Sequence, residues 1–516
     1  MPDTATIDAL IRSRAASYAD KPAVIDSGAR LSYGDLDTSS RELAASLVQA
    51  GVGKGTRVGL IMPNSVAWVR TAIAVTRIGA VLVPLSTLLT PSELRTQLQV
   101  AAVQYLIGVE EFRGRRYLDG LPGKRSAALP ALQQVATLEN LATTAAGPGP
   151  VRVFDAMTEA VTPSDLMLIM FTSGSSGPPK GVGHSHGSAL GAVASGLAAR
   201  CITADTRLYL PMPFFWVGGF GGGVLSALLA GATLITEEIP KPETTLALVE
   251  SERVTLFRGW PDQAQELARH AGSADLSALR PGSLEALLPP ELRAEPGARA
   301  NLFGMTESFG PYCGFASDTD MPQSAWGSCG KPFEGMEVRI VDIDTAEPVP
   351  AGTVGEIQLR GPHVLRGICG RSREEIFTVD GYYPTGDLGR LDHDGFLFYH
   401  GRSDDMFKVS GATVYPSEVE RALRAIDGVT AAFATNVPDA GRNRVGAVVA
   451  GDGLTIEGLR GRSRDLLSPF KVPTVWLLVE GSDAIARGPT GKVDMRRLRE
   501  LLAAGCRQEI ESGSGS

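Results

Sequence analysis

Cysteine and histidine are scarce in this 516-residue chain, which contains five cysteines and six histidines. The number of cysteines is odd, and no two of them form a Cys-x-x-Cys pair. This pattern excludes a disulfide framework and a cysteine-based zinc site, and it indicates reduced thiols. The cysteines are Cys201, Cys313, Cys329, Cys369 and Cys506.

Long apolar runs and an excess of basic residues are also missing. No stretch approaches the roughly 20 apolar residues that span a bilayer, and the first residues lack the apolar core of a secretion signal. The 49 lysines and arginines are outnumbered by 57 acidic residues, whereas nucleic-acid-binding proteins normally present a basic face. Basic clusters such as Arg113–Arg116 are expected to be solvated surface. We therefore expect a cytoplasmic protein that neither binds nucleic acid nor spans a membrane.

The chain has enough apolar material for more than one core. It is 43% hydrophobic and 21% charged, which is typical of a soluble globular protein, and its length predicts two or more domains. In the first third, expected strands at 57–65, 80–86 and 103–109 alternate with expected helices at 65–80 and 90–102. The second helix opens with Thr-Pro-Ser-Glu, a favourable start. This alternation predicts a parallel sheet covered by helices on both faces.

The sequence pattern changes after about residue 335. Residues 336–361 alternate apolar and polar positions between turn signals, as a β-hairpin or small barrel does. Residues 395–409 then pass from a strand through a charged break into a second strand. We place a domain boundary in that break, at Gly401–Asp405, which leaves about a hundred residues for a small α+β domain.

The stretch FTSGSSGPPKGVGHSH, Phe171–His186, follows the apolar run LMLIMF. The run predicts a buried strand that delivers a loop rich in uncrowded backbone N–H groups and hydroxyls, closed by Lys180. Such a loop suits a polyanion, most simply a phosphate chain, although Ser/Gly-rich stretches also serve as flexible linkers. It is not a Walker loop, because the pattern G-x-x-x-x-G-K-[ST] is absent.

Four further stretches carry candidate functional side chains. They are NLFGMTES with Glu307, YYPTGDLGRLDHDG with Asp387, GRSDD with Arg402, and ARGPTGKVDMRRLRE with Lys492. Taken singly, each of these residues could be an ordinary turn acid or a solvated cation. Their order along the chain, behind the Ser/Gly/Lys loop, is the informative feature.

Together the five stretches resemble the adenylate-forming superfamily, which includes acyl-CoA synthetases, luciferases and adenylation domains of peptide synthetases. The resemblance covers nearly the whole chain. It implies an α/β fold in which a large N-terminal domain of doubly wound mixed sheets plus a small barrel precedes a small mobile α+β domain. The implied ranges are an adenylate- and acyl-binding domain at 1–401, a hinge at 402–405 and a mobile domain at 406–510. The tail at 511–516 is expected to be disordered.

The resemblance also implies roles for individual residues in binding ATP and Mg²⁺. The loop should wrap the β- and γ-phosphates, and its small residues let the backbone approach them and move. Phe303 should stack on adenine, Thr306 should contact the α-phosphate, and Glu307 should hold Mg²⁺. Asp387 and Arg402 should hold the ribose hydroxyls. The nucleotide-binding residues so implied are Thr172, Ser173, Gly174, Ser175, Ser176, Gly177, Lys180, Phe303, Gly304, Met305, Thr306, Asp387 and Arg402.

The implied chemistry consists of two displacements. The carboxylate attacks the α-phosphorus of ATP to give acyl-AMP and pyrophosphate, with Lys492, Thr306 and Glu307 as catalytic residues. The small domain then rotates about Asp404 and brings Ser410 and Gly411 to the channel for the thiol of coenzyme A. The thiolate attacks the acyl carbon and AMP leaves. In the first displacement, the charge of Lys492 should offset developing negative charge.

Two departures from the family pattern stand out. Relatives carry a Ser-Gly-Gly-Ala-Pro stretch and a full helix where this chain has LRPGSLEALLPPELRAEPGARA. This change is either a harmless variation or an impairment of adenylation that spares thioester formation. Many relatives also have histidine where Trp216 stands, in PFFWVGGFGGGV. The glycines beyond it serve either tight helix packing or a wide, apolar acyl pocket, lined by Trp216, Val217, Gly218, Gly219 and Phe220.

The leading hypothesis is an AMP-forming acyl-CoA ligase for a hydrophobic, bulky carboxylic acid. The alternatives are an enzyme that only forms the thioester from a partner's acyl-AMP, a stand-alone adenylation enzyme that loads a carrier protein, and a non-catalytic binding paralogue. The sequence leaves the acid and the oligomeric state, monomer or dimer, undetermined.

Overall fold

In the computed structural model, the chain divides into two compact units. The described residues are 5–121, 126–142, 148–172, 179–403, 405, 407–409, 412–439, 442–481, 485, 487 and 493–513. The first unit comprises 1–338, 359–383 and 395–397, and the second comprises 339–358, 384–394 and 398–516.

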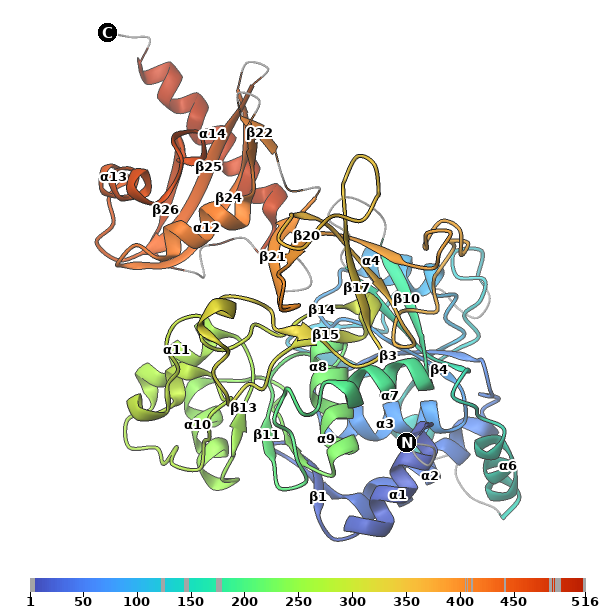
Figure 1. The fold of residues 1–516 in the computed structure, drawn as a ribbon. Coiled ribbons are helices and arrows are strands. Elements are labelled where there is room, and N and C mark those ends of the chain that lie inside the picture. The colour runs from blue at the N-terminus through green and yellow to red at the C-terminus, as the bar shows by residue number, and fades with distance from the viewer. Residues whose placement is uncertain are drawn as a thin grey trace. The chain divides into compact units, whose positions relative to one another are not determined.

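A seven-stranded sheet forms one half of the first unit (Figure 1). Its strands, in spatial order, are β19 (Gly367–Ile368), β10 (Lys180–Ser185), β9 (Leu166–Thr172), β4 (Val81–Pro84), β3 (Arg57–Ile61), β5 (Tyr105–Gly108) and β8 (Gln134–Thr137). The strands from β9 to β8 run parallel, while β10 and β19 are antiparallel additions at one edge. The predicted α/β alternation in the first third of the chain is therefore confirmed.

A five-stranded sheet forms the other half of the first unit. Its strands, in spatial order, are β13 (Leu256–Phe257), β11 (Arg207–Tyr209), β12 (Thr233–Ile235), β1 (Pro22–Ile25) and β2 (Arg30–Ser32). All pairs are parallel except β1 with β2. The carboxyl ends of the parallel strands therefore share one edge of this sheet, where ligands of α/β proteins commonly bind.

Helices pack against the two sheets and complete a large apolar core (Figure 1). The helices of the first unit are α1 (Ile7–Tyr18), α2 (Tyr33–Gln49), α3 (Val66–Arg77), α4 (Pro91–Val100), α5 (Leu138–Ala142), α6 (Pro148–Glu159), α7 (His186–Ser195), α8 (Val217–Gly219), α9 (Ser226–Ala230), α10 (Pro242–Ser251) and α11 (Pro261–His270). Helix α4 begins as predicted: the Thr90 side chain accepts from the Glu93 backbone, and the Glu93 side chain accepts from the Thr90 backbone. The buried face of α3, with Trp68 and Ile73, lies in the core.

A small antiparallel sheet contains part of the motif NLFGMTES, Asn301–Ser308. It consists of β14 (Phe303–Met305), β15 (Gly310–Gly314) and β16 (Lys331–Pro332). A short turn, Thr306–Ser308, joins β14 to β15. The motif NLFGMTES is thus a strand followed by a loop, as predicted.

In its described residues, the second unit combines three sheets with three helices. Strands β17 (Glu337–Val341), β18 (Gly355–Arg360), β20 (Tyr383–Leu391) and β21 (Leu397–Arg402) form a four-stranded sheet in that order, with a few end residues in the first unit. The remaining elements are β22 (Phe407–Val409), β23 (Ala412–Val414), α12 (Pro416–Arg424), β24 (Val429–Asp439), β25 (Arg442–Gly451), α13 (Ile456–Leu466), β26 (Val475–Val479) and α14 (Met495–Gly513). Strands β24, β25 and β26 form one sheet, and α12 and α13 contribute side chains to its core. The small α+β part is therefore confirmed.

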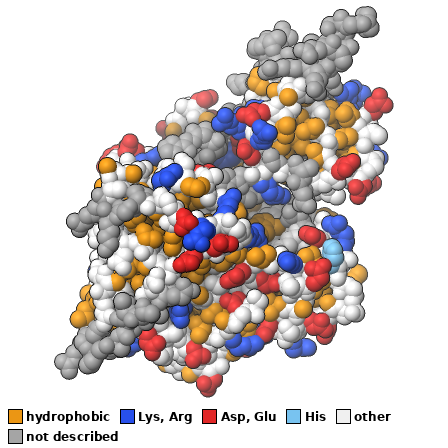
Figure 2. Space-filling view, turned by 180° about the vertical axis from the view of Figure 1, so that it is seen from behind, with side chains coloured by type: hydrophobic (Ala, Val, Ile, Leu, Met, Phe, Trp, Pro, Cys, Tyr) orange, Lys and Arg blue, Asp and Glu red, His pale blue; other side chains and the backbone are white. Residues whose placement is uncertain are grey.

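The domain boundaries predicted from the sequence stay predictions. The division into units assigns 339–358 and 384–394 to the same unit as the C-terminal residues, whereas the prediction began the small domain after the break at Gly401–Asp405. Among the described residues, no helix is both long enough and apolar enough to cross a bilayer. On the face drawn in Figure 2, acidic and basic side chains are interspersed.

Candidate functional site

The predicted phosphate loop opens and closes on two adjacent strands. Thr172 ends β9 and Lys180 begins β10, and the two residues face each other in the antiparallel ladder. The apolar run before the loop is buried, as predicted, whereas Thr172 and Lys180 are half-buried. Both ends of the loop are thus fixed by the sheet, while residues 173–178, which include the predicted Ser173 to Gly177, lie outside the described residues.

A buried histidine ties the Thr306 turn to the same strand pair. His184 lies in β10, and its Nε2 is 2.8 Å from the carbonyl oxygen of Thr306. Because a carbonyl only accepts, Nε2 carries the hydrogen and donates. Burial lowers the pKa of His184 to about 4, so the ring is neutral at pH 7. Its ring also packs on Phe309, with centroids 5.0 Å apart. The backbone of Thr306 and the strand that bears Lys180 are therefore held together.

Glu307 is a buried carboxylate with a tyrosine partner. The residue is 6% exposed. Its Oε1 accepts from the Tyr383 hydroxyl at 3.1 Å, and its carbonyl accepts from the Leu365 backbone at 2.8 Å. Within the described parts of the chain, no lysine or arginine forms an ion pair with Glu307. A buried carboxylate without a basic partner favours a cation supplied from outside the chain.

Phe303 and Gly304 occupy the strand before this turn. The half-buried Phe303 ring meets the Tyr312 ring edge-on, with centroids 5.7 Å apart. A side-chain carbon on Gly304 would lie 2.0 Å from the carbonyl oxygen of Gly310, which no real contact allows. Glycine is therefore required here by the close pairing of β14 with β15. Met305, also predicted for the nucleotide site, ends β14 and is half-buried.

Trp216 stands at the start of a distorted helix. Its ring meets the Trp260 ring edge-on at 5.9 Å. Helix α8 then passes into a π-helical turn, Phe220–Leu225, a distortion frequent at functional sites. Phe220 is fully buried, and its ring packs against Trp68 at 5.5 Å.

The glycines between Gly218 and Gly223 divide into two groups, according to what a side-chain carbon would meet. A side-chain carbon on Gly219 would clash with the Pro213 carbonyl at 2.0 Å, and one on Gly223 would lie 2.8 Å from the Leu210 side chain. One on Gly218 would lie 3.1 Å from the Met212 sulfur, whereas one on Gly222 would meet nothing within 4 Å. Tight helix packing thus accounts for at least two of these glycines.

The unusual loop after α11 is fixed by leucines. Leu287 and Leu288 are buried in an apolar cluster that includes Phe257 and Leu267. This loop contains two short 3-10 turns, Glu285–Leu287 and Pro290–Leu292, in line with the expectation of a short helix after Pro290. Within the loop that lacks the glycine pair, Leu287 and Leu288 thus have their side chains in the core, whereas Leu284 is half-buried and Glu285 is exposed.

In the second unit, the structure brings Asp387 and Arg402 together. Asp387 lies in β20 and is 6% exposed, and Arg402 ends β21. Arg402 Nη1 is 3.4 Å from Asp387 Oδ1 and donates to the Thr385 carbonyl at 2.7 Å. Gly386 has a φ of +71° and leaves room for the guanidinium, because a side-chain carbon there would lie 2.7 Å from Nη2. The other predicted residues of this unit, Asp404, Ser410, Gly411 and Lys492, lie outside the described residues.

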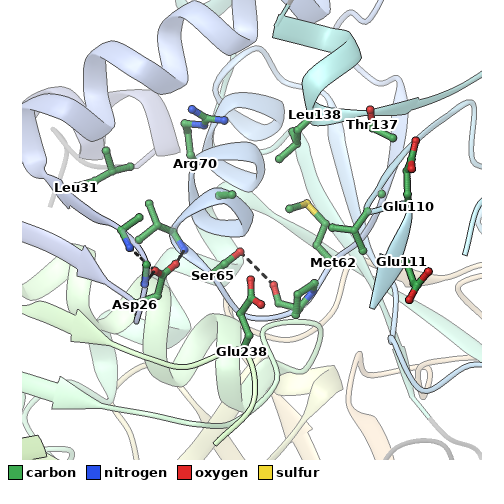
Figure 3. A pocket seen from close by; sticks show the side chains of 17 residues that line it. Asp26, Leu31, Met62, Ser65, Arg70, Glu110, Glu111, Thr137, Leu138 and Glu238 are labelled. Carbon is green, nitrogen blue, oxygen red and sulfur yellow. Dashed lines mark hydrogen bonds between the residues drawn. The ribbon is translucent and has the colours of Figure 1, made fainter. Parts of the chain in front are cut away.

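A pocket of about 680 Å³ lies elsewhere in the first unit (Figure 3). It is lined by residues at the carboxyl ends of β1, β3, β5, β8 and β12, and none of them was predicted as a site residue. Figure 3 shows Glu110 and Glu111 on one side and Asp26 on the other. The Asp26 carboxylate accepts from three backbone N–H groups, those of Gly28, Ala29 and Val66, at 2.7–2.8 Å. Asp26 therefore stabilises the turn and the start of α3.

Sequence reasoning missed three residues of the site. His184 and Tyr383 lie in the quoted motifs, GVGHSH and YYPTGD, but received no role. Their spacing from Lys180 and Asp387 gave no sign that both contact the Thr306–Glu307 turn. Trp260 follows β13, far along the chain from Trp216, and no local pattern pairs them.

Comparison with known proteins identifies the family. Residues 11–369 match the AMP-binding enzyme family. A 3-(7a-methyl-1,5-dioxo-octahydro-inden-4-yl)propanoyl:CoA ligase of Mycobacterium tuberculosis is 33% identical over 96% of this chain and 98% of its own length. A feruloyl-CoA synthase of an Amycolatopsis species is 33% identical over 91% of this chain and 94% of its own length.

Solved structures share the fold. The anthranilate CoA ligase AuaEII, in complex with anthranoyl-AMP, superposes with a TM-score of 0.81 at 22% identity, over 98% of this chain and 99% of that chain. The O-succinylbenzoate CoA synthetase of Bacillus subtilis, in complex with AMP, superposes with a TM-score of 0.77 at 22% identity, over 95% and 98%. The chain therefore belongs to the AMP-binding enzyme family, as an acyl-CoA synthetase-like member of the adenylate-forming superfamily.

Proposed function

We propose that this enzyme converts a bulky, hydrophobic carboxylic acid to its coenzyme A thioester through an acyl-AMP intermediate. The observation that carries the proposal is the similarity, over 96% of the chain, to a CoA ligase named for a methylated bicyclic propanoyl group. Similarity to a feruloyl-CoA synthase and to a 3-hydroxybenzoate CoA ligase adds two further acids with rings. Trp216 and Trp260, one edge-on to the other, supply an apolar wall suited to such rings.

For the first half-reaction, we propose the following nucleotide contacts. The loop closed by Thr172 and Lys180 holds the β- and γ-phosphates, and Phe303 stacks on adenine. Thr306 contacts the α-phosphate, and the sheet fixes its position through His184. In the second unit, Asp387 accepts hydrogen bonds from the ribose hydroxyls, and its partner Arg402 donates hydrogen bonds to them.

Glu307 fits the proposed Mg²⁺ site. It is a buried carboxylate with one oxygen bonded to Tyr383 and no ion-pair partner within the described residues. Mg²⁺ prefers such oxygen ligands together with phosphate oxygens. When bound, the ion neutralises phosphate charge as pyrophosphate forms. Tyr383 donates its hydroxyl hydrogen to Glu307 and orients the carboxylate.

The exchange between half-reactions stays a proposal from the sequence. Lys492 offsets negative charge while the carboxylate attacks the α-phosphorus. Rotation about Asp404 then brings Ser410 and Gly411 to the thiol channel, with Trp216 at its inner end. The glycine at 411 leaves that channel open.

The acyl pocket is proposed to begin at Trp216 and Val217. Gly222, where a side-chain carbon would meet nothing within 4 Å, leaves space along the π-helical turn, whereas one on Gly218 would lie 3.1 Å from the Met212 sulfur. Gly219 is needed for packing and Phe220 lies in the core, so we expect these two residues to shape the pocket through the backbone.

The experiment is a panel of carboxylic acids incubated with ATP, Mg²⁺ and coenzyme A, with acyl-AMP and acyl-CoA detected separately by mass spectrometry. Acids with saturated or aromatic rings should give acyl-CoA, and short polar acids should not. Acyl-AMP without acyl-CoA would instead favour the adenylation enzyme that loads a carrier protein. No product from any acid would favour the non-catalytic paralogue.

The altered loop motivates a second candidate, an enzyme that forms thioesters from a partner's acyl-AMP. Alignment of a carboxylate with ATP is demanding, since a misplacement of about 1 Å can cost roughly a hundredfold in rate. The buried side chains of Leu287 and Leu288 favour the complete two-step ligase, because they fill the core. Pyrophosphate release from acid and ATP that is much slower than thioester formation from supplied acyl-AMP would favour the second candidate.

A further inference from the structure

Arg200 is a deeply buried cation that the predicted mechanism does not use. It follows α7 and is 5% exposed. Its Nη1 donates to the Ser226 hydroxyl at 3.0 Å, and that hydroxyl donates to the Gly221 carbonyl at 2.7 Å. One arm of the guanidinium is therefore fixed against the π-helical turn that follows α8.

The charge of Arg200 has no acidic partner within the described residues. No carboxylate there forms an ion pair with it, and its Nη2 is buried without a hydrogen-bond acceptor. The charged neighbour that acts on it is a half-buried arginine, Arg258, whose Nη2 donates to the Arg200 carbonyl at 2.9 Å. Burial, and then Arg258, lower the pKa of Arg200 to about 10, so it remains protonated at pH 7. An uncompensated buried charge is costly, which favours an acceptor that is not part of the protein.

The geometry around Arg200 shows which way Nη2 faces. A side-chain carbon on Gly196 would lie 3.4 Å from the Arg200 Cζ and 3.1 Å from the Phe333 ring, so that side is packed. One on Gly310 would lie 3.5 Å from Nη2 and 3.9 Å from the Cγ2 of Val217, with no other atom within 4 Å. The buried Nη2 therefore lies on the side of the guanidinium that faces Gly310 and Val217, the residue at which the proposed acyl pocket begins.

We propose that Arg200 determines acid specificity by donating a hydrogen bond from Nη2 to an oxygen acceptor on the acyl group, remote from the reacting carboxylate. The acceptor is a ring carbonyl or a second carboxylate, since both offer lone pairs to a guanidinium. The preferred substrates are then bulky, largely apolar acids that carry one such oxygen. This inference rests on the proposed function and on the proposed place of the acyl pocket.

The size of the effect follows from the burial of the donor. A site built around a buried donor rejects an analogue that lacks the acceptor, because the donor is then left unpaired. A hydrogen bond to a charged group is worth enough to change kcat/KM by about 10- to 100-fold. The half-buried Arg258 offers a neighbouring control, since its Nη2 has two acceptors, the Arg200 carbonyl and the Ser317 hydroxyl.

The test compares three acids of similar shape: 3-cyclohexylpropanoate, 3-(4-oxocyclohexyl)propanoate and 3-(4-carboxycyclohexyl)propanoate. Acyl-CoA formation is measured for the unmodified enzyme, Arg200→Met and Arg258→Met, each checked for folding by thermal melting. The unmodified enzyme should prefer the ketone or the diacid over the apolar acid by about tenfold or more in kcat/KM. Arg200→Met should abolish that preference, and Arg258→Met should keep it. The acid that shows the preference identifies the acceptor.

Several results would overturn the proposal. If the unmodified enzyme uses all three acids equally well, no residue of its acyl pocket recognises the oxygen acceptor. If folded Arg200→Met still prefers acids that carry the oxygen acceptor, another residue causes that preference, and the proposed ligase function is unaffected. If Arg200→Met does not fold, Arg200→Gln, which keeps a donor but loses the charge, should reduce the preference, and no reduction would contradict the role of Arg200. Absence of acyl-CoA from every acid would overturn the proposed function and this inference together.

Discussion

At the scale of single residues, His184 links burial to a measurable pH dependence. Its pKa falls from 6.5 to about 4 because burial disfavours the charged ring. The unfolded chain therefore binds a proton between these values that the folded chain does not, so stability is complete above about pH 6.5 and is lost as pH falls toward 4. The shift corresponds to about 3 kcal/mol at most.

Replacing His184 by glutamine should make unfolding less sensitive to acid. Glutamine keeps a donor for the Thr306 carbonyl but does not titrate. Urea unfolding of the unmodified chain and of His184→Gln, between pH 4.5 and 7.5, should show a smaller loss of stability in the variant. His186, whose pKa burial also lowers to about 4, remains in both proteins and supplies a common background. Identical pH profiles would mean that His184 is not the titrating group.

Tyr383 is expected to act through Glu307. Tyr383→Phe removes the hydroxyl that Glu307 accepts at 3.1 Å, and loss of such a supporting partner typically weakens metal binding or activity by about 10- to 100-fold. The Mg²⁺ concentration for half-maximal pyrophosphate release should rise, while thioester formation from supplied acyl-AMP should be little changed. Tyr382→Phe is the control, because the Tyr382 hydroxyl donates to Glu337 instead, at 3.0 Å. Equal effects of the two variants on Mg²⁺ dependence would contradict this role.

At the scale of elements, Gly304 determines how closely β14 and β15 pair. Gly304→Ala places a carbon 2.0 Å from the Gly310 carbonyl, so the strands must separate and Phe303 and Thr306 must move. We expect a lower melting temperature and a loss of adenylation of at least tenfold, since small displacements at the reacting atoms are costly. Gly367→Ala in β19 is the matched control, because nothing lies within 4 Å of its added carbon. Adenylation that survives Gly304→Ala unchanged would place the nucleotide elsewhere.

Elements with a local cause could be predicted from the sequence. The capping box at Thr90, the apolar run of β9 and the break before β22 depend on residues close together in the chain, and all three are observed. The family resemblance assigned Asp387 and Arg402 to the same ribose, which stays a prediction, and the structure shows the two side chains 3.4 Å apart. The contact of Tyr383 with Glu307 and the position of Arg200 Nη2 beside Gly310 and Val217 depend on long-range packing, which no local pattern encodes.

At the scale of the whole molecule, the proposed function assigns roles to residues that lie far apart in the chain. Lys180, Thr306 and Glu307 belong to the first unit, while Asp387 and Arg402 belong to the second. The proposed lysine, Lys492, follows them near the C-terminus of the same chain. Because it is proposed to act in adenylation only, its loss should affect one transition state and spare the other.

The most direct test of this account measures the two half-reactions separately in the unmodified enzyme and in Lys492→Ala. Pyrophosphate release from the best acid and ATP reports the first, and acyl-CoA formation from supplied acyl-AMP reports the second. The account predicts that the unmodified enzyme performs both. It also predicts that Lys492→Ala slows pyrophosphate release by at least about a hundredfold while changing thioester formation no more than a few-fold. Equal loss in both half-reactions, or an unmodified enzyme that releases no pyrophosphate with any acid, would contradict it.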